Sequence, residues 1–329
     1  ESLAAVVYRM LRDQARNLPD YRLNTQLGPQ APLFVGGDYT IPGFYTQRGY
    51  QKLFVAQGAD LVSEILRDNW VLGEGDSLSA KDLGRLLVEM EQLYFRDYAA
   101  HWSEAIAQLN ILPAGSAALG AAQLAGLTAA NSPLLQLLLE VRENTRFAGL
   151  AEATAGAGEL AEAAQGAGGK LGKAAKLATA AAEQAQAAML KNIPDTARKT
   201  LERRFAPLHQ LLDENGAAGR ELTASLQALD ALQLQLASLA HASAPEQAAF
   251  EMAKARMGGQ RDAINQLRSS AARLPQPVGK WLGLLAEDSW SLVLSDAYHY
   301  LNQRYRNELY ASYRGSLRER CPFSAHSAS

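Results

Sequence analysis

The chain contains only one cysteine, Cys321, among its 329 residues. No intramolecular disulfide can therefore form within it, and a metal site built from several cysteines is excluded. Large domains with good hydrophobic cores do without disulfides even in oxidising compartments. The shortage of cysteine alone does not place the chain inside or outside the cytoplasm.

An excess of charge of one sign is also lacking. The chain carries 32 Lys and Arg against 34 Asp and Glu, a formal net charge of −2. Proteins that bind nucleic acids usually present a strongly basic face. The balanced charge therefore argues against a nucleic-acid partner.

A long unbroken apolar run is missing as well. The nearest candidate is the uncharged stretch 105–139, which is interrupted by Gln108, Asn110, Pro113, Gln123, Asn131 and Pro133. We expect two short buried helices here and no transmembrane span, which needs about 20 consecutive apolar residues. The chain begins at Glu1 without Met or a signal peptide, so we expect a piece of a longer protein.

The residues that are abundant favour helix. Hydrophobic residues make up 48% of the chain, and much of this share is Ala and Leu, which prefer helix to strand. The apolar spacing predicts helices over about 1–17, 46–69, 79–109, 116–129, 196–215, 222–239, 245–257, 260–273, 277–285 and 288–314, and one more that begins at Pro133 and includes Val141. A strand around Leu33–Val35 is as consistent with the Pro- and Gly-rich segment 21–40 as a loop is. We predict an all-α fold, an elongated assembly of two helical subdomains, with a short strand pair near the N-terminal loop left open.

The composition changes over residues 149–190, which are almost wholly Ala, Gly, Glu, Lys and Gln. Such a segment has little bulky apolar surface to bury in a core. We predict an insertion or linker over 149–195. It would separate an N-terminal helical subdomain (1–148) from a C-terminal one (196–315), and 316–329 would begin a further domain.

The sequence carries no recognisable catalytic or ligand-binding motif. The Gly-rich segment does not form a phosphate loop, because Ala164 and Ala167 stand where glycines are needed and Leu171 and Ala174 where Ser or Thr is needed. None of the five histidines has a partner at the spacing of a zinc-binding helix; they are His101, His209, His241, His299 and His326. We therefore expect no catalytic residue, no cofactor and no metal site.

Three weaker pairs have alternatives. Asp97 with His101, and Asp296 with His299, lie about one helical turn apart, so each could be half of a metal site or of a catalytic pair. A hydrogen bond on a helix surface is the favoured interpretation. The third pair is Cys321 with His326, and a thiol nucleophile there is disfavoured because the tail lacks a third group to orient it.

The C-terminal segment from Tyr298 to Arg320 mixes tyrosines with arginines. Basic residues interleaved with aromatics can bind single-stranded nucleic acid. Tyrosines and leucines recur here every three or four residues, however, as one apolar stripe of a helix. We expect that stripe to face the core and the arginines to lie on a solvated face, where a protein partner could use them.

The stretch Ile41–Tyr50 combines a turn, a helix start and three aromatics. Pro42-Gly43 is typical of a turn, and Thr46 can cap the following helix. The aromatic residues then need a packing partner. Asp97, Tyr98 and His101 are expected to lie partly off the apolar stripe of the 79–109 helix, which comprises Leu83, Leu86, Leu87, Met90, Leu93, Tyr94, Trp102, Ile106 and Leu109.

These motifs, in this order, resemble the C-terminal periplasmic region of the TssM/IcmF family, the inner-membrane component of type VI secretion systems. The elements that carry the resemblance begin with Pro42, Gly43, Phe44, Tyr45, Thr46, Gly49 and Tyr50, followed by Trp70, Gly73, Tyr94, Tyr98 and Trp102. Later matches continue to Arg320–Phe323, although Cys321 stands where the family more often has Tyr. We expect the motif residues to be structural.

The resemblance implies a scaffold that spans the periplasm of a Gram-negative bacterium and has no enzymatic activity. The implied partners are the outer-membrane lipoprotein TssJ, mainly through a following β domain, the inner-membrane protein TssL and further copies of the chain. No nucleic acid and no small-molecule substrate are expected. The competing interpretations are a cytoplasmic helical adaptor and a periplasmic hydrolase.

Overall fold

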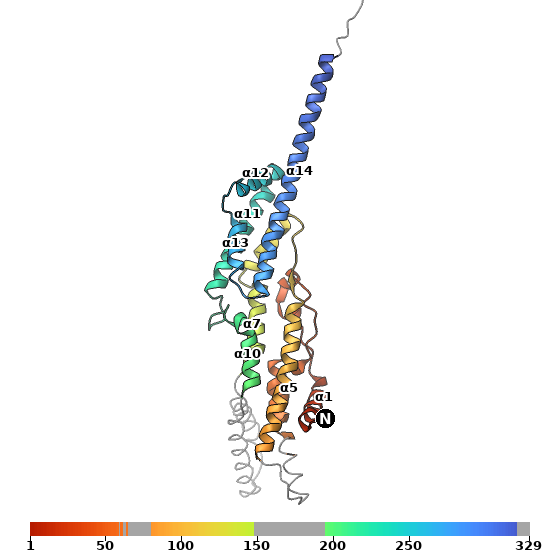
Figure 1. Ribbon diagram of the computed structural model, residues 1–329, viewed down its shortest axis with the longest axis vertical. Coiled ribbons are helices and arrows are strands. Elements are labelled where there is room, and N and C mark those ends of the chain that lie inside the picture. The colour runs from red at the N-terminus through yellow and green to blue at the C-terminus, as the bar shows by residue number, and fades with distance from the viewer. Residues whose placement is uncertain (59, 62–63, 65–79, 148–194, 321–329) are drawn as a thin grey trace, which may run out of the picture. The chain divides into compact units, whose positions relative to one another are not determined.

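In the computed structural model of the chain, the described residues are 1–58, 60–61, 64, 80–147 and 195–320. These residues are mostly helical (Figure 1). Two short strands, β1 (Phe34–Val35) and β2 (Asn110–Ile111), pair with each other. The predicted helical fold is confirmed, and the short strand pair near the N-terminal loop is present.

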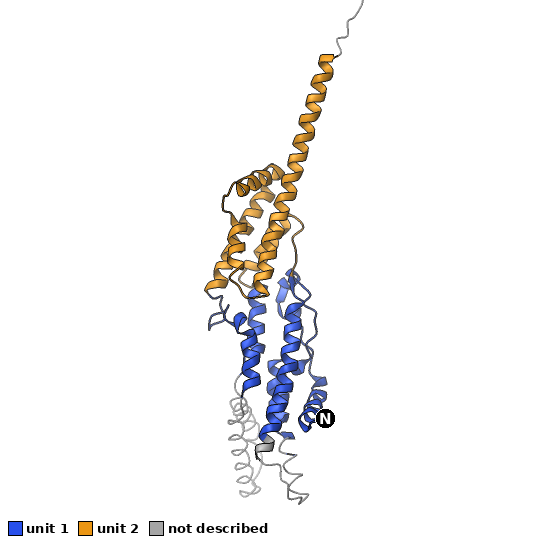
Figure 2. Ribbon diagram, viewed as in Figure 1, with its two compact units in different colours: residues 1–110, 133–219 blue, residues 111–132, 220–329 orange. Residues whose placement is uncertain are grey.

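The contacts within the chain define two compact units (Figure 2). Unit 1 comprises residues 1–110 and 133–219, and unit 2 comprises residues 111–132 and 220–329. Most of the predicted linker, 149–195, lies outside the described residues. The subdomain boundaries drawn from the sequence therefore remain predictions.

Unit 1 contains the N-terminal helices and the long helix that organises them. Its elements are α1 (Leu3–Gln14), η1 (Ala15–Asn17), α2 (Leu23–Gln26), η2 (Gly28–Leu33), η3 (Gly43–Tyr45), α3 (Gln47–Gly49), the π-helical turn η4 (Tyr50–Val55), α5 (Ala80–Ala107), α7 (Pro133–Thr145) and α10 (Thr196–His209). Helix α5 packs against α1 and α10, and α10 also packs against α7. Pro133 begins α7 as predicted, because proline is preorganised for the first helical position.

Unit 2 is a helical bundle made of α6 (Ala117–Thr128), α11 (Arg220–His241), α12 (Pro245–Met257), α13 (Ala263–Ala271) and α14 (Val278–Arg320). Helix α11 packs against α6 and α13, and α14 packs against α12 and α13. The buried stripe of α11 includes Leu222, Leu229, Leu232 and Leu236. Its spacing was visible in the sequence, which is why the helix was predicted correctly.

Helix α14 differs from its prediction in two ways. The sequence suggested a short helix over 277–285, a second over 288–314 and an end at Gly315, but one helix runs from Val278 to Arg320. Its first part packs in unit 2, whereas its last part extends beyond the neighbouring helices (Figure 1). The tyrosine and leucine stripe was expected to face the core and is instead exposed. Phe250 of α12 packs on Tyr300 beside the start of the stripe, and residues 301–320 are exposed.

None of the described helices alone is long and apolar enough to cross a bilayer. Helices α6 and α7 reach the length and apolar composition of a membrane span only when they are taken together as a bent pair.

Candidate functional site

The densest cluster of large side chains lies in unit 1 and is here called the aromatic core. Its members are buried rings from η3, η4, α5 and the residues after α7: Phe44, Tyr45, Tyr50, Phe54, Tyr94, Phe95, Tyr98, Trp102 and Phe147. The rings of Phe54 and Tyr94 stack with centroids 4.2 Å apart, and Phe44 meets Tyr94 edge-on at 4.9 Å. Both arrangements are favoured by aromatic rings. The packing joins segments about 50 residues apart in the sequence.

The polar atoms of the aromatic core fix helix α5 to the backbone of other elements. The Tyr94 hydroxyl donates to the carbonyl oxygen of Phe44 at 2.6 Å, and Trp102 Nε1 donates to that of Tyr45 at 2.7 Å. The Tyr98 hydroxyl donates to the carbonyl oxygen of Asn144 in α7. A buried hydroxyl or indole N–H needs such a partner, because losing its hydration is costly. These bonds therefore select one register of α5 against η3 and α7.

Two glycines let the backbone approach closely at the start of this motif. A Cβ added at Gly49 would lie 2.2 Å from the carbonyl oxygen of Gly43, and one added at Gly43 would lie 2.4 Å from that of Pro19. Thr46 lies between them, donates to the Gly43 carbonyl at 2.8 Å and accepts from the Gly49 N–H at 3.1 Å. The predicted cap at Thr46 is confirmed. No larger residue would fit at either glycine without moving the backbone.

A second polar cluster borders the aromatic core. The Tyr8 hydroxyl from α1 lies 2.6 Å from the Tyr45 hydroxyl and donates to Asp97 Oδ2 at 2.6 Å. His101 stacks on Tyr45 and shares a hydrogen bond with the Tyr39 hydroxyl at 2.9 Å. The hydrogen bond expected between Asp97 and His101 is thus replaced, because tyrosines from other elements reach both residues. Burial raises the pKa of Tyr8, so its hydroxyl stays a hydrogen-bond donor.

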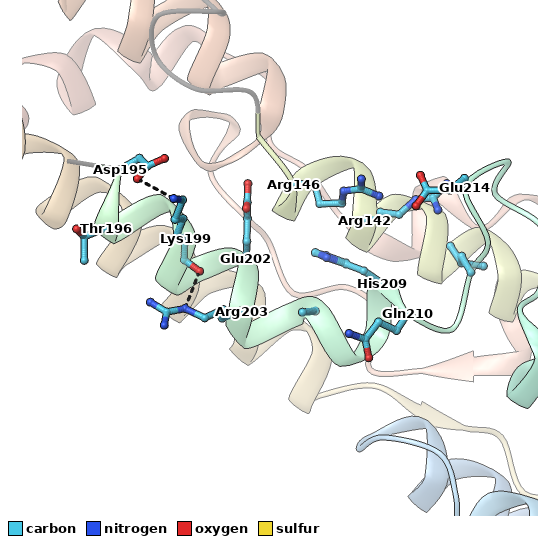
Figure 3. Close-up of a pocket in the computed structure, with 12 residues that line it drawn as sticks. Arg142, Arg146, Asp195, Thr196, Lys199, Glu202, Arg203, His209, Gln210 and Glu214 are labelled. Carbon is cyan, nitrogen blue, oxygen red and sulfur yellow. Dashed lines mark hydrogen bonds and ion pairs between the residues drawn. The ribbon is translucent and has the colours of Figure 1, made fainter. Parts of the chain in front are cut away.

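Helices α7 and α10 border an open groove with a volume of about 950 Å³. Figure 3 shows Arg142 of α7, Arg146 just after the end of α7 and His209 of α10 around the same space. The charged lining residues are Arg142, Arg146, Lys199 and Arg203, with Asp195, Glu202 and Glu214. The carboxylate of Asp195 forms an ion pair with Lys199 at 3.4 Å. Mixed charge of this kind suits ion pairing at a protein surface, and the lining residues supply no nucleophile held by a base.

His209 is the one histidine that this groove holds. Its Nε2 shares a 2.5 Å hydrogen bond with the Thr145 hydroxyl. Partial burial, together with the charges of Arg146 and Arg142, lowers the pKa of His209 to about 4. The imidazole is therefore neutral near neutral pH and has a structural hydrogen bond. Sequence reasoning could not pair Thr145 with His209, because 64 residues separate them.

Glu91 is a buried carboxyl group that sequence reasoning missed. It lies on α5 with 4% of its surface exposed, four residues before the buried Phe95. That spacing is the signal that could have found it. Burial raises the pKa of Glu91 to about 7, although the charge of Arg198 on α10 opposes the rise. The stability of unit 1 should therefore depend on the protonation state of Glu91 near neutral pH.

The structure brings together all but two of the motif residues singled out in the sequence. Pro42 precedes η3, and the motif residues from Gly43 to Tyr50 meet Tyr94, Tyr98 and Trp102 around the aromatic core. Trp70 and Gly73 lie outside the described residues, as do Cys321 and His326. Within the described ranges, no three His, Cys, Asp or Glu side chains are grouped so that they could hold a metal ion.

The fold and the candidate site are those of a helical protein whose main cluster, the aromatic core, has a structural role. Comparisons with known proteins narrow this class. The profile of the IcmF-related family, described as "Intracellular multiplication and human macrophage-killing", matches residues 1–146. The type VI secretion system component TssM1 of Pseudomonas aeruginosa is 26% identical over 99% of this chain, which covers 30% of that protein.

Two solved structures share the fold. A chain of a "Type VI secretion system membrane core complex" matches 100% of this chain with a TM-score of 0.64 at 19% identity. A chain of a "Type VI membrane complex" matches 99% with a TM-score of 0.50 at 17% identity. This chain covers 57% of each of them, so it spans only part of its relatives. These comparisons confirm the similarity to the TssM/IcmF family that the ordered motifs predicted.

Proposed function

We propose that this chain is the helical part of the periplasmic region of a TssM-like protein and works as a structural scaffold in a type VI secretion membrane complex. The observation that carries the proposal is the similarity to TssM1, which extends over 99% of the chain. Similarity of this extent includes both compact units and not only the motif around the aromatic core. The packing of unit 1 supports a mechanical role, because bonds from side chains to backbone hold α5 in one register.

The proposed partners follow from the family. They are the outer-membrane lipoprotein TssJ, bound mainly through a following β domain, the inner-membrane protein TssL and further copies of the chain. In this scheme the helical units separate the membrane-bound end of the protein from the lipoprotein. A catalytic role is not proposed, because the polar clusters of the described residues are engaged in structural bonds.

Protease accessibility tests the location. In cells that produce the native protein, the helical region should resist added protease while the outer membrane is intact and be cleaved in spheroplasts. A cytoplasmic marker protein, measured in the same samples, shows whether the inner membrane has stayed closed. Protection in intact spheroplasts would favour a cytoplasmic helical adaptor and would exclude the proposed location.

Calorimetry with the lipoprotein encoded beside the chain tests the role. The native protein and a form lacking residues 1–329 are each titrated with the lipoprotein. Equal binding by both forms would make the helical region a spacer, whereas binding that needs residues 1–329 would make it part of the interface. Absence of binding and of co-purification with the native protein would contradict the proposed assembly.

A further inference from the structure

The last part of α14 presents an apolar face that the described residues leave exposed, here called the α14 face. Its large side chains are 46% to 65% exposed and comprise Tyr298, Leu301, Tyr305, Leu309, Tyr310, Tyr313 and Leu317. Most of them recur every three or four residues, so they form a continuous stripe on one side of the helix. Single exposed apolar residues are ordinary, but a large contiguous patch marks an interaction surface.

The α14 face is large enough for a specific interface. Residues 298–320 extend over roughly 34 Å at about 1.5 Å per residue. Four tyrosines and three leucines that each expose about half of their surface offer roughly 700 Å² of contact area, close to the 800 Å² per partner of a standard interface. Tyrosine is also among the residues most enriched at energetically important contacts. A helix or extended segment of similar length would cover the face.

The charges beside the α14 face are mainly positive. Residues 298–320 contain five arginines and two glutamates: Arg304, Arg306, Arg314, Arg318 and Arg320, with Glu308 and Glu319. Arg304 forms an ion pair with Glu308 at 3.1 Å. Arg314 lies over the Tyr310 ring at 5.1 Å, a contact that leaves its positive charge available to a carboxylate. A second copy of the same face would bring two such sets of arginines together, which like-charge repulsion opposes.

We propose that the α14 face binds an acidic amphipathic segment of a protein partner, with apolar side chains against the tyrosines and carboxylates against the arginines. The inference rests on the exposed residues of α14 and not on the proposed function, so the two can fail separately. Arginine suits this role because its planar guanidinium can bind a carboxylate through two parallel hydrogen bonds. The apolar stripe would supply contact area, and the arginines would select a partner of negative charge.

Site-specific photocrosslinking tests the occupant. A benzoylphenylalanine residue replaces Tyr305 in the native protein in its own cells, and the crosslinked peptide is identified by mass spectrometry. The control places the same residue at Leu234 of α11, which is 61% exposed. The expected product contains a segment with more Asp and Glu than Lys and Arg. A yield no higher than at position 234, a basic or neutral segment, or α14 of a second copy would overturn the proposal.

Charge reversal tests the arginines. The double variant Arg306→Glu with Arg314→Glu should lower the crosslinking yield at position 305 at least tenfold, whereas Arg306→Lys with Arg314→Lys should lose much less. The control is Lys280→Glu with Arg261→Glu, which changes the net charge equally at exposed positions of unit 2 away from the α14 face. Circular dichroism checks that each variant is folded. An unchanged yield in the reversed variant, or an equal loss in the control, would contradict the charge assignment.

Discussion

The aromatic core of unit 1 and the α14 face use the same kinds of side chain at similar helical spacing, yet one is buried and the other is exposed. On α5, Tyr94, Tyr98 and Trp102 have 0% of their surface exposed. On α14, Tyr305 and Tyr313 are more than 60% exposed. The comparison shows that spacing defines one face of a helix but does not determine what covers it.

The difference lies in what the rest of the chain places opposite each helix. For α5, the turn and glycines of residues 42–49 bring backbone carbonyls within reach of the aromatic hydroxyl and indole groups. Burial raises the pKa of Tyr94 and Tyr98 well above the ordinary value, so both hydroxyls remain donors. The described residues of unit 2 provide nothing equivalent beside residues 298–320.

Removing a large side chain from each region should give the largest contrast. Trp102→Ala should lower the free energy of unfolding of unit 1 by about 4 kcal/mol, because it leaves a cavity and an unpaired carbonyl oxygen at Tyr45. Tyr305→Ala should change stability by less than about 0.5 kcal/mol, as exposed substitutions do. Urea denaturation followed by circular dichroism measures both. Similar losses from the two substitutions would mean that α14 is packed in solution.

A methyl group added at a glycine tests how tightly each region is packed. Gly49→Ala should destabilise unit 1 by about 3 kcal/mol, since the new Cβ would overlap the Gly43 and Phe44 carbonyl oxygens. Gly315→Ala on α14 meets nothing within 4 Å, and alanine favours helix by about 0.5–1 kcal/mol over glycine. In thermal unfolding, Gly49→Ala should lower the melting temperature and Gly315→Ala should leave it unchanged or raise it slightly. A neutral Gly49→Ala would contradict the close approach.

The sequence predicted the helices and caps of both regions, but not which helix face would be buried. The leucine stripe of α11, the cap at Thr46 and Pro133 at the start of α7 depend on nearby residues, and local patterns predict them. Tyr98 was placed partly off the stripe of its helix, yet it is fully buried because Phe147 and the Asn144 carbonyl lie beside it. Such contacts come from distant segments, which periodicity does not locate.

The errors at α14 have the same origin. The apolar stripe from Tyr298 was a correct indication of a one-sided helix. Its interpretation as core assumed a covering element that the described residues do not supply. The charged groove of α7 and α10 was missed for the complementary reason, since Arg146 and His209 become neighbours only after folding. Sequence patterns therefore predicted the elements well and the candidate sites only where local chemistry determined them.

The buried carboxyl group of Glu91 should make the stability of unit 1 depend on pH. The pKa of Glu91 is raised to about 7 from 4.5, so the native state keeps a proton that the unfolded state releases between these values. Its contribution to stability is fully present below about pH 4.5 and is lost as the pH rises to about 7, a change on the order of 3 kcal/mol. Glu91→Gln should flatten the stability profile of unit 1 over this range.

The control for Glu91→Gln is Glu308→Gln on the exposed part of α14, where the carboxylate forms an ion pair with Arg304. This variant should keep the pH dependence of the unmodified protein. Urea titrations at intervals of half a pH unit, from about pH 4.5 to 8, measure both profiles. An unchanged slope in Glu91→Gln would mean that another group titrates in this range.

Removing one hydroxyl from each region tests the smallest difference. Tyr94→Phe leaves the ring packed but removes the donor to the Phe44 carbonyl oxygen, so unit 1 should lose about 1–1.5 kcal/mol. Tyr313→Phe, with its side chain 62% exposed, should be neutral within about 0.5 kcal/mol in the isolated chain. Urea denaturation compares the two. If Tyr94→Phe is neutral, the bond to the Phe44 carbonyl oxygen does not set the register of α5. Ring packing and the glycine turn would then hold α5 and η3 together without it.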